Sequence, residues 1–264
     1  MQVKEIREKL KEMNPLIHCI TNPISIRECA NVILSAGARP MMAVHPAEVQ
    51  TVTKSAGALL INLGNLTEER EKAILLSADA AGRNNIPCVL DLCGAAGLKN
   101  RRELALSVIK KAAPGIIKGN YAEIKALYDE TYKNPGVDTD ECIGIEEISE
   151  AAKTLAQRYK TTILASGKTD VITDGNTLYH CENGTPQLAK ITGTGCMQGA
   201  LSAAFLSAAE ALDAALFSCV MYAVCGEKAE TPLGSGSFEV RLMDALSVIE
   251  SEEIERKAKL KKVM

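Results

Sequence analysis

The stretch that decides the fold is residues 192–209, TGTGCMQGALSAAFLSAA. Its glycines at positions 193 and 195 allow the backbone to turn tightly and to approach a ligand closely. The small apolar residues from Gly199 to Ala209 predict a closely packed, buried helix. The start of such a helix offers unpaired N–H groups and a positive dipole, which bind anions. By itself, the turn is equally well explained as a tight turn without a ligand.

On the amino-terminal side of this stretch, short apolar segments alternate with helical patterns. This order predicts an α/β fold with a mostly parallel sheet and helices on both faces. No linker interrupts residues 1–264, so we expect one domain without a separate lid. A charged amphipathic helix is expected at the N-terminus. The other expected helices are Ser25–Ala36, Ala47–Ser55, Thr67–Arg83, Arg101–Ala112, Asn120–Tyr128 and Ile145–Tyr159, and the expected strands are Leu16–Ile20, Pro40–Ala43, Ala58–Asn62, Cys88–Asp91, Ile116–Lys118, Thr162–Ala165 and Val171–Thr173.

An antiparallel edge is predicted around the turn-forming pair Asn183-Gly184. Segments Thr177–Cys181 and Gln187–Ile191 flank this pair and are expected to form a hairpin. The basic tail from Arg256 to Lys262 is expected to be a solvated helix face.

Composition narrows the possible function classes. A net charge of −3 argues against a nucleic-acid-binding surface, because such surfaces carry a basic stripe. No segment reaches the ~18 consecutive apolar residues of a membrane span, and the N-terminus lacks the apolar core of a signal peptide. Nine cysteines, an odd number without CxxC spacing, are typical of free thiols in a reducing compartment, and no structural metal is expected. We therefore expect a cytoplasmic protein.

Two carboxylates follow predicted strands. Asp91 ends one strand, at the sheet edge where open α/β folds place their ligands, although a carboxylate there is as often a turn or cap residue. Glu123 lies three residues after Asn120. This spacing is explained either by a capping box between the two residues or by a role of Glu123 as a ligand of an Mg²⁺ ion that binds nucleotide phosphates. Cys196 lies where a helix dipole lowers a thiol pKa, although free cysteines are more often small buried apolar groups.

A series of short motifs runs along nearly the whole chain: Ile20-Thr21-Asn22, Ala30-Asn31, Gly37-Ala38-x-Pro40-x-Met42, Leu60-Ile61-Asn62-x-Gly64-x-Leu66, Lys118-Gly119-Asn120-x-x-Glu123-Ile124, Ser166-Gly167, Asp170-x-Ile172-Thr173-Asp174-Gly175, Thr192-Gly193-Thr194-Gly195-Cys196 and Gly234-x-Gly236-Ser237-Phe238. Taken together and in this order, these motifs resemble the hydroxyethylthiazole kinases of the ribokinase-like superfamily.

The resemblance implies a ribokinase-like three-layer sandwich with antiparallel edge strands. It also implies transfer of the ATP γ-phosphate to the primary alcohol of 4-methyl-5-(2-hydroxyethyl)thiazole in thiamin salvage, with Mg²⁺ required. Such kinases form homotrimers with active sites between subunits. The implied roles are Cys196 as base; Gly193, Thr194, Gly195 and Cys196 as anion hole; Met42, Gly193 and Asn22 as substrate contacts; Lys118 and Ser166 as ATP contacts; and Asp91 and Glu123 as metal ligands.

The chain departs from the family pattern at three places. Lys118 replaces an arginine, and Ser166 replaces a threonine, which predicts weaker nucleotide binding. The segment Asp91-Leu92-Cys93 stands where the family has Asp-Pro-Val, which leaves room for a different substrate. The alternatives are a hydroxymethylpyrimidine kinase, a non-catalytic homologue, and a cysteine-dependent acyltransferase using Cys196 with His18, His45 or His180.

Overall fold

The computed structural model describes residues 3–132 and 143–264. One nine-stranded sheet has the order β2-β1-β3-β4-β5-β6-β7-β8-β9. The strands are β1 (Leu16–Ile20), β2 (Arg39–Met41), β3 (Ala58–Asn62), β4 (Cys88–Asp91), β5 (Ile116–Asn120), β6 (Thr162–Ser166), β7 (Asp170–Thr173), β8 (Leu178–Cys181) and β9 (Leu260–Lys262). Pairing is parallel from β2 to β6 and antiparallel from β6 to β9. The predicted mostly parallel sheet with antiparallel strands at one edge is confirmed.

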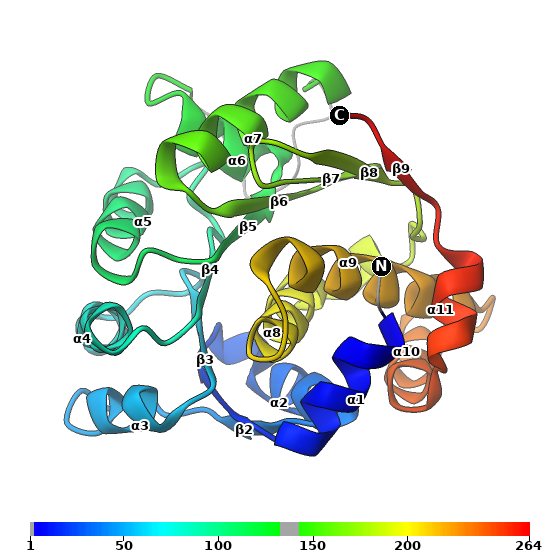
Figure 1. The fold of residues 1–264 in the computed structure, drawn as a ribbon, viewed down its shortest axis with the longest axis horizontal. Coiled ribbons are helices and arrows are strands. Elements are labelled where there is room, and N and C mark those ends of the chain that lie inside the picture. The colour runs from blue at the N-terminus through cyan, green and yellow to red at the C-terminus, as the bar shows by residue number, and fades with distance from the viewer. Residues whose placement is uncertain (1–2, 133–142) are drawn as a thin grey trace.

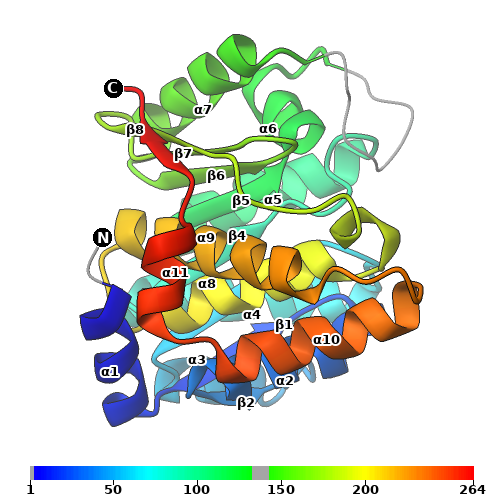
Figure 2. The same ribbon diagram turned by 90° about the vertical axis from the view of Figure 1, so that its right-hand side faces the viewer.

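Helices cover both faces of this sheet and make a three-layer sandwich (Figure 1). One face carries α3 (Val49–Ser55), α4 (Glu68–Asn84), α5 (Lys99–Ala112), α6 (Tyr121–Tyr128) and α7 (Ile145–Tyr159). The other carries α1 (Val3–Met13), α2 (Ile26–Ala36), α8 (Thr194–Leu206), α9 (Ala211–Ala229), α10 (Ser235–Val248) and α11 (Ser251–Lys257), as Figure 2 shows from the side. Short 3₁₀ turns, η1 (Pro23–Ser25) and η2 (Leu188–Lys190), complete the elements of the described residues.

Each face has its own apolar core. The side chains of α3 to α7 pack with Leu59, Ile61 and other residues of one sheet face, and those of α1, α2 and α8 to α11 pack with Leu60, Val89 and other residues of the opposite face. The central strands β3 and β4 have helices on both faces and are fully buried along their lengths. This explains why their sequences are continuous apolar runs rather than alternating ones.

The predicted hairpin after Thr177 is wrong. The strand β8 pairs with β7 and with the carboxy-terminal β9, whereas residues Leu188–Lys190 form a 3₁₀ turn. The Asn183 side chain explains the difference: its Nδ2 donates to Lys257 O at 2.9 Å, and its Oδ1 accepts from Lys259 N at 2.6 Å. The tail therefore takes the place beside β8, and part of it is an edge strand rather than a helix face.

The helix α8 determines where the functional site lies. It is buried without interruption from Cys196 to Leu206, and it packs on β3, β4, α2 and α9. Its first residue follows a turn at the edge where the parallel strands end. Within the described residues, no helix has the combined length and hydropathy needed to cross a membrane.

Candidate functional site

The start of α8 is an uncapped helix end. Gly193 has φ +84°, and a Cβ at this position would lie 2.8 Å from Ser25 Cβ, so both the backbone conformation and the space require glycine. No side chain caps the helix, and Met197 N donates to Gly193 O at 2.9 Å. The N–H groups of Thr194, Gly195 and Cys196 precede that bond and have no acceptor within the helix. This geometry is what an anion hole needs.

Cys196 lies at this helix start and contacts two neighbouring loops. Its side chain is buried, and Asn62 Nδ2 donates to its Sγ at 3.4 Å from the end of β3. The Cys93 thiol also donates a hydrogen bond to it, which lowers the pKa of the Cys196 thiol, while burial acts in the opposite direction. The lowered pKa makes this thiol a better source of thiolate than an ordinary buried cysteine.

Lys118 and Asp91 form a buried ion pair beside this thiol. Lys118 Nζ lies 3.5 Å from Asp91 Oδ2, and the two side chains are 3% and 4% exposed. A Cβ built on Gly195 would lie 3.5 Å from Lys118 Nζ, which places the ammonium group next to the start of α8. Burial alone would lower the pKa of Lys118, but the charges of Asp91 and Glu123 outweigh it and raise that pKa. The lysine is therefore a fixed, buried cation at the start of α8.

Glu123 forms the capping box that the sequence allowed as one interpretation. Asn120 Oδ1 accepts from Glu123 N at 2.8 Å, and Glu123 Oε2 accepts from Asn120 N at 2.8 Å. Glu123 Oε1 accepts from Gly94 N at 2.7 Å, which ties α6 to the loop after β4. Burial and the charge of Asp91 raise the pKa of this carboxyl.

The pair Asp91 and Glu123 fits a magnesium ion by its chemistry. Both offer hard carboxylate oxygens, the ligand type that Mg²⁺ takes. Each carboxylate oxygen has two acceptor positions, so the backbone N–H bonds at Glu123 leave capacity unused. Lys118 compensates only one of these two buried negative charges.

The remaining predicted residues lie around the same sheet edge. Ser166 ends β6 opposite Asn120 of β5, and its Oγ donates to Gly119 O at 3.3 Å. Met42 follows β2 and packs against the apolar core that contains Cys196. Asn22 follows β1, but its Oδ1 already accepts from Ile24 N at 3.3 Å and from Asn65 Nδ2 at 2.9 Å. The side-chain oxygen of Asn22 thus stabilises the loop that follows β1.

Sequence reasoning assigned no role to several residues of the site. Asn62 lies in a quoted motif, but only the fold brings it to Cys196. Cys93 lies in the loop noted as a departure from the family. Arg70, on α4, donates to Thr21 O at 2.8 Å, to Asn62 O at 3.3 Å, to Asn65 O at 2.5 Å and to Gly64 O. No sequence signal marked this arginine, because its partners are backbone carbonyls, which have no residue-type signature, in the loop just before α4 and in the distant loop after β1.

The geometry argues against a cysteine–histidine pair. His18 is buried and bonded to Thr53 Oγ1 at 2.9 Å and to Ala43 O at 3.0 Å, and His180 bonds Ser149 Oγ at 3.1 Å on the opposite face. The exposed His45 accepts from Ala47 N at 3.2 Å. The hydrogen-bond partner that β3 gives the Cys196 sulfur is the Asn62 amide, and the histidine hydrogen bonds given above go to other groups, so nothing in the described residues favours the acyltransferase alternative.

Comparison with known proteins gives one consistent family. The model of the Hydroxyethylthiazole kinase family matches residues 7–252. The chain is 39% identical over 261 residues to "Hydroxyethylthiazole kinase 2" of Clostridium botulinum, covering 97% of this chain and 98% of the relative. It is also 39% identical over 262 residues to "Hydroxyethylthiazole kinase" of Finegoldia magna, covering 99% and 97% of the two chains.

Solved structures agree with these sequence comparisons. A hydroxyethylthiazole kinase of Pyrococcus horikoshii superposes with a TM-score of 0.91 at 32% identity, over 99% of both chains. A pyridoxal kinase of Bacillus subtilis superposes with a TM-score of 0.61 at 18% identity, over 83% of this chain and 94% of that one, which shows a shared ribokinase-like fold. The matching motifs, the fold and the site geometry lead to one conclusion: the chain belongs to the hydroxyethylthiazole kinase family.

Proposed function

We propose that this protein transfers the γ-phosphoryl group of ATP to the primary alcohol of hydroxyethylthiazole, in thiamin salvage. Membership of the family makes it a phosphotransferase and implies ATP as co-substrate. The observation that best supports the proposal is the convergence of Cys196, Lys118 and Asp91 at the open N-terminus of α8. The hydroxymethylpyrimidine and non-catalytic alternatives have no comparable support.

The anion hole is the main catalytic device in this proposal. A transferring phosphoryl group carries negative charge on its oxygens, and its loose transition state needs positioning and charge neutralisation more than covalent help. The N–H groups of residues 193–196 and the Lys118 ammonium would meet that charge, an electrostatic contribution of about 3 kcal/mol by analogy with other anion holes.

Cys196 would hold the proton that the substrate alcohol loses. The hydrogen bond from the Cys93 thiol lowers the pKa of the Cys196 thiol, which favours the thiolate form that accepts a proton. Asn62, which donates to the same sulfur, would keep the thiolate turned toward the helix start. Because a loose transition state demands little from the base, a thiolate suffices.

Substrate and nucleotide would occupy opposite sides of this centre. Met42, Gly193 and Asn22 lie at the β1 and β2 side and would contact the thiazole, with Asn22 acting through its loop. Lys118 and Ser166 lie at the β5 and β6 side and would contact ATP. Asp91 and Glu123 would hold Mg²⁺, which neutralises phosphate charge when bound.

Product analysis tests the function directly. The purified protein is incubated with ATP, Mg²⁺ and hydroxyethylthiazole, and phosphorylated product is followed by mass spectrometry, with hydroxymethylpyrimidine as the control alcohol. We expect the thiazole phosphate. Phosphorylation of only the pyrimidine would show that the protein is a hydroxymethylpyrimidine kinase. The absence of any ATP-dependent product would favour the non-catalytic alternative.

The quaternary structure is part of the proposal. Four exposed apolar side chains lie on η1, α2 and β2, of which η1 and β2 each contact α2: Ile24, Ile26, Leu34 and Met41. Burying them against a second copy would stabilise an oligomer, so we propose a homotrimer with active sites between subunits. A cytoplasmic location, one domain over residues 1–264 and the absence of nucleic-acid or membrane partners complete the proposal.

A further inference from the structure

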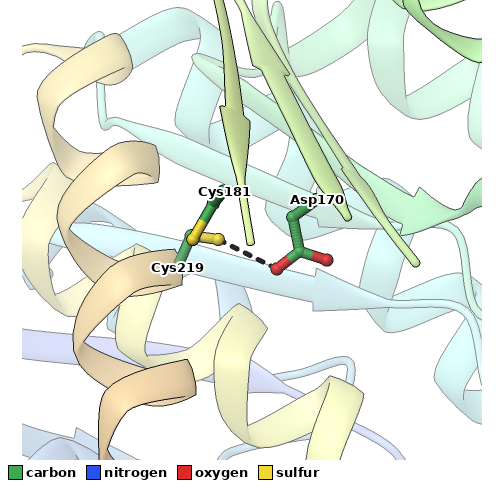
Figure 3. A group of neighbouring side chains, drawn as sticks. All are labelled: Asp170, Cys181 and Cys219. Atoms are coloured by element: carbon green, nitrogen blue, oxygen red, sulfur yellow. Dashed lines mark hydrogen bonds between the residues drawn. The ribbon is translucent and has the colours of Figure 1, made fainter. Parts of the chain in front are cut away.

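Asp170 occupies a buried position that the catalytic proposal does not use. It is the first residue of β7, and residues Gly167 to Thr169 form the turn that joins β7 to β6. Its side chain lies beside Cys181 of β8 and Cys219 of α9 (Figure 3). A buried carboxylate is costly unless hydrogen bonds satisfy it, so its partners indicate its role.

Both carboxylate oxygens of Asp170 have hydrogen-bond partners. Oδ1 accepts from Gly167 N at 2.9 Å, and Oδ2 accepts from Cys219 Sγ at 3.0 Å. The first bond closes the turn on itself, and the second fixes the carboxylate to the helix α9. Asp170 thereby connects the turn after Ser166 to the centre of the second helical layer.

Tyr121 holds the same turn from the other side. Its hydroxyl donates to Thr169 O, and its ring lies so close to Gly167 that a Cβ there would be 2.6 Å from Tyr121 Cε1. Tyr121 directly follows Asn120, at the end of β5, so the turn is clamped between α6 and α9. Binding sites need rigidly supported backbone of this kind.

The same three side chains could also be considered as a metal site, since Asp170, Cys181 and Cys219 offer ligand atoms within 4.8 Å of one another. Metal ligation requires deprotonated thiols. Hydrogen bonding to Cys181, burial and the charge of Asp170 raise the pKa of the Cys219 thiol well above its ordinary value. The distance of 3.0 Å between Cys219 Sγ and Asp170 Oδ2 is that of a hydrogen bond from a thiol to a carboxylate, and this bond accounts for the contact between the two side chains.

We propose that Asp170 is a positioning residue for the nucleotide: it fixes the turn from Ser166 to Thr169 so that the Ser166 hydroxyl and the neighbouring backbone face ATP. The inference rests on the proposed function, because it takes Ser166 as an ATP contact. Asp170 acts through Gly167 and does not touch the reacting atoms.

Steady-state kinetics of graded variants test this role. Asp170→Ala removes the acceptor for Gly167 N, and we expect the KM for ATP to rise on the order of tenfold. Asp170→Asn keeps a carbonyl acceptor, so the increase should be smaller, about threefold. The KM for the alcohol should stay unchanged in both. Cys225→Ala is the matched control, since this cysteine is also fully buried on α9 but has no bond to Asp170.

The inference is overturned if Asp170→Ala lowers the melting temperature as Cys225→Ala does and leaves the KM for ATP unchanged. If Asp170→Ala does not fold, Asp170→Asn carries the same comparison. Calorimetric binding of a non-hydrolysable ATP analogue separates this inference from the proposed function. If the wild-type protein binds the analogue but does not phosphorylate the thiazole, only the proposed substrate is wrong. If the wild type and the Asp170 variants bind the analogue with equal affinity, only the positioning role of Asp170 is wrong.

Discussion

At the scale of single residues, the site is a set of short contacts between side chains far apart in the sequence. Cys196 receives hydrogen bonds from Asn62 and Cys93, and Lys118 pairs with Asp91. Each of these contacts gives its residue a property that the isolated amino acid lacks: a lowered thiol pKa or a fixed buried cation. Because these groups are buried, each substitution below is read together with the unfolding free energy of the variant.

Replacing Cys196 by alanine should lower kcat by about tenfold to a hundredfold, because the base is lost while the helix N–H groups remain. Affinity for ATP should be retained, and Cys196→Asp should stay active because a carboxylate also accepts the proton. Turnover and nucleotide binding are measured separately. Complete inactivity of Cys196→Asp would count against the base role.

The Cys93 thiol should set the pH range of activity. A base works when deprotonated, so the rate rises as pH rises through the pKa of Cys196 and then levels off. Because the hydrogen bond from Cys93 lowers that pKa, Cys93→Val should move the rise to higher pH. Cys93→Ser keeps a donor and should restore the original profile. An unchanged pH–rate profile of Cys93→Val would show that the Cys93 thiol does not influence the pKa of Cys196.

The two carboxylates should govern the dependence on magnesium. Asp91→Asn and Glu123→Gln each remove one negative charge, and we expect the Mg²⁺ concentration for half-maximal rate to rise by about tenfold. Glu123→Gln keeps one carbonyl acceptor for the two backbone N–H groups of Gly94 and Asn120, so we expect it to lower the unfolding free energy by about 1–3 kcal/mol as well, and its Mg²⁺ dependence is measured under conditions where the variant is folded. Normal Mg²⁺ dependence in both variants would falsify the metal assignment.

At the scale of elements, helix ends and loops meet at one edge of the sheet because the strands β1, β3, β4, β5 and β6 run parallel. Their carboxyl ends bring Asn62 and Asp91 to α8, and Ser166 to the same edge of the sheet beside Asn120. Arg70 of α4 holds two of these loop ends together through backbone carbonyls only. The loops are therefore supported by a residue that contacts none of the proposed catalytic side chains.

Arg70→Met should destabilise the protein by about 3 kcal/mol, because buried carbonyls after β1 and β3 would lose their donors. Chemical denaturation measures this change. Arg83→Met is the matched control on the same helix: Arg83 is 76% exposed and pairs with Asp79, so its loss should change the unfolding free energy by at most about 0.5 kcal/mol. Equal changes in unfolding free energy for both substitutions would contradict the role of Arg70 in holding the two loops together.

At the scale of the whole molecule, the two apolar cores leave exposed apolar side chains on η1, α2 and β2. If the protein is the proposed homotrimer, light scattering after size-exclusion chromatography should give a molar mass of about 85 kDa, which is three chains of 28.2 kDa each. Replacing Ile24 by Glu, where the side chain is 55% exposed, should dissociate the oligomer and reduce activity together. A fully active species of one chain mass would refute sites between subunits.

The sequence by itself determined the α/β class, the order of the parallel strands and helices, and the turn that opens α8. These features depend on local periodicity, on the conformational freedom of glycine and on short motifs, all of which can be recognised from neighbouring residues in the sequence. It also predicted the Asn120–Glu123 capping box as one of two interpretations, because such a box needs only a spacing of three residues.

Only the tertiary structure decided which distant segments meet. It placed the carboxy-terminal tail, rather than residues 187–191, beside β8, since Asn183 bonds Lys257 and Lys259. It also brought Cys93 to Cys196, Arg70 to the loop carbonyls, and Cys219 to Asp170. These contacts join residues separated by tens of positions, and their partners are fixed by packing of whole layers, which no local pattern in the chain encodes.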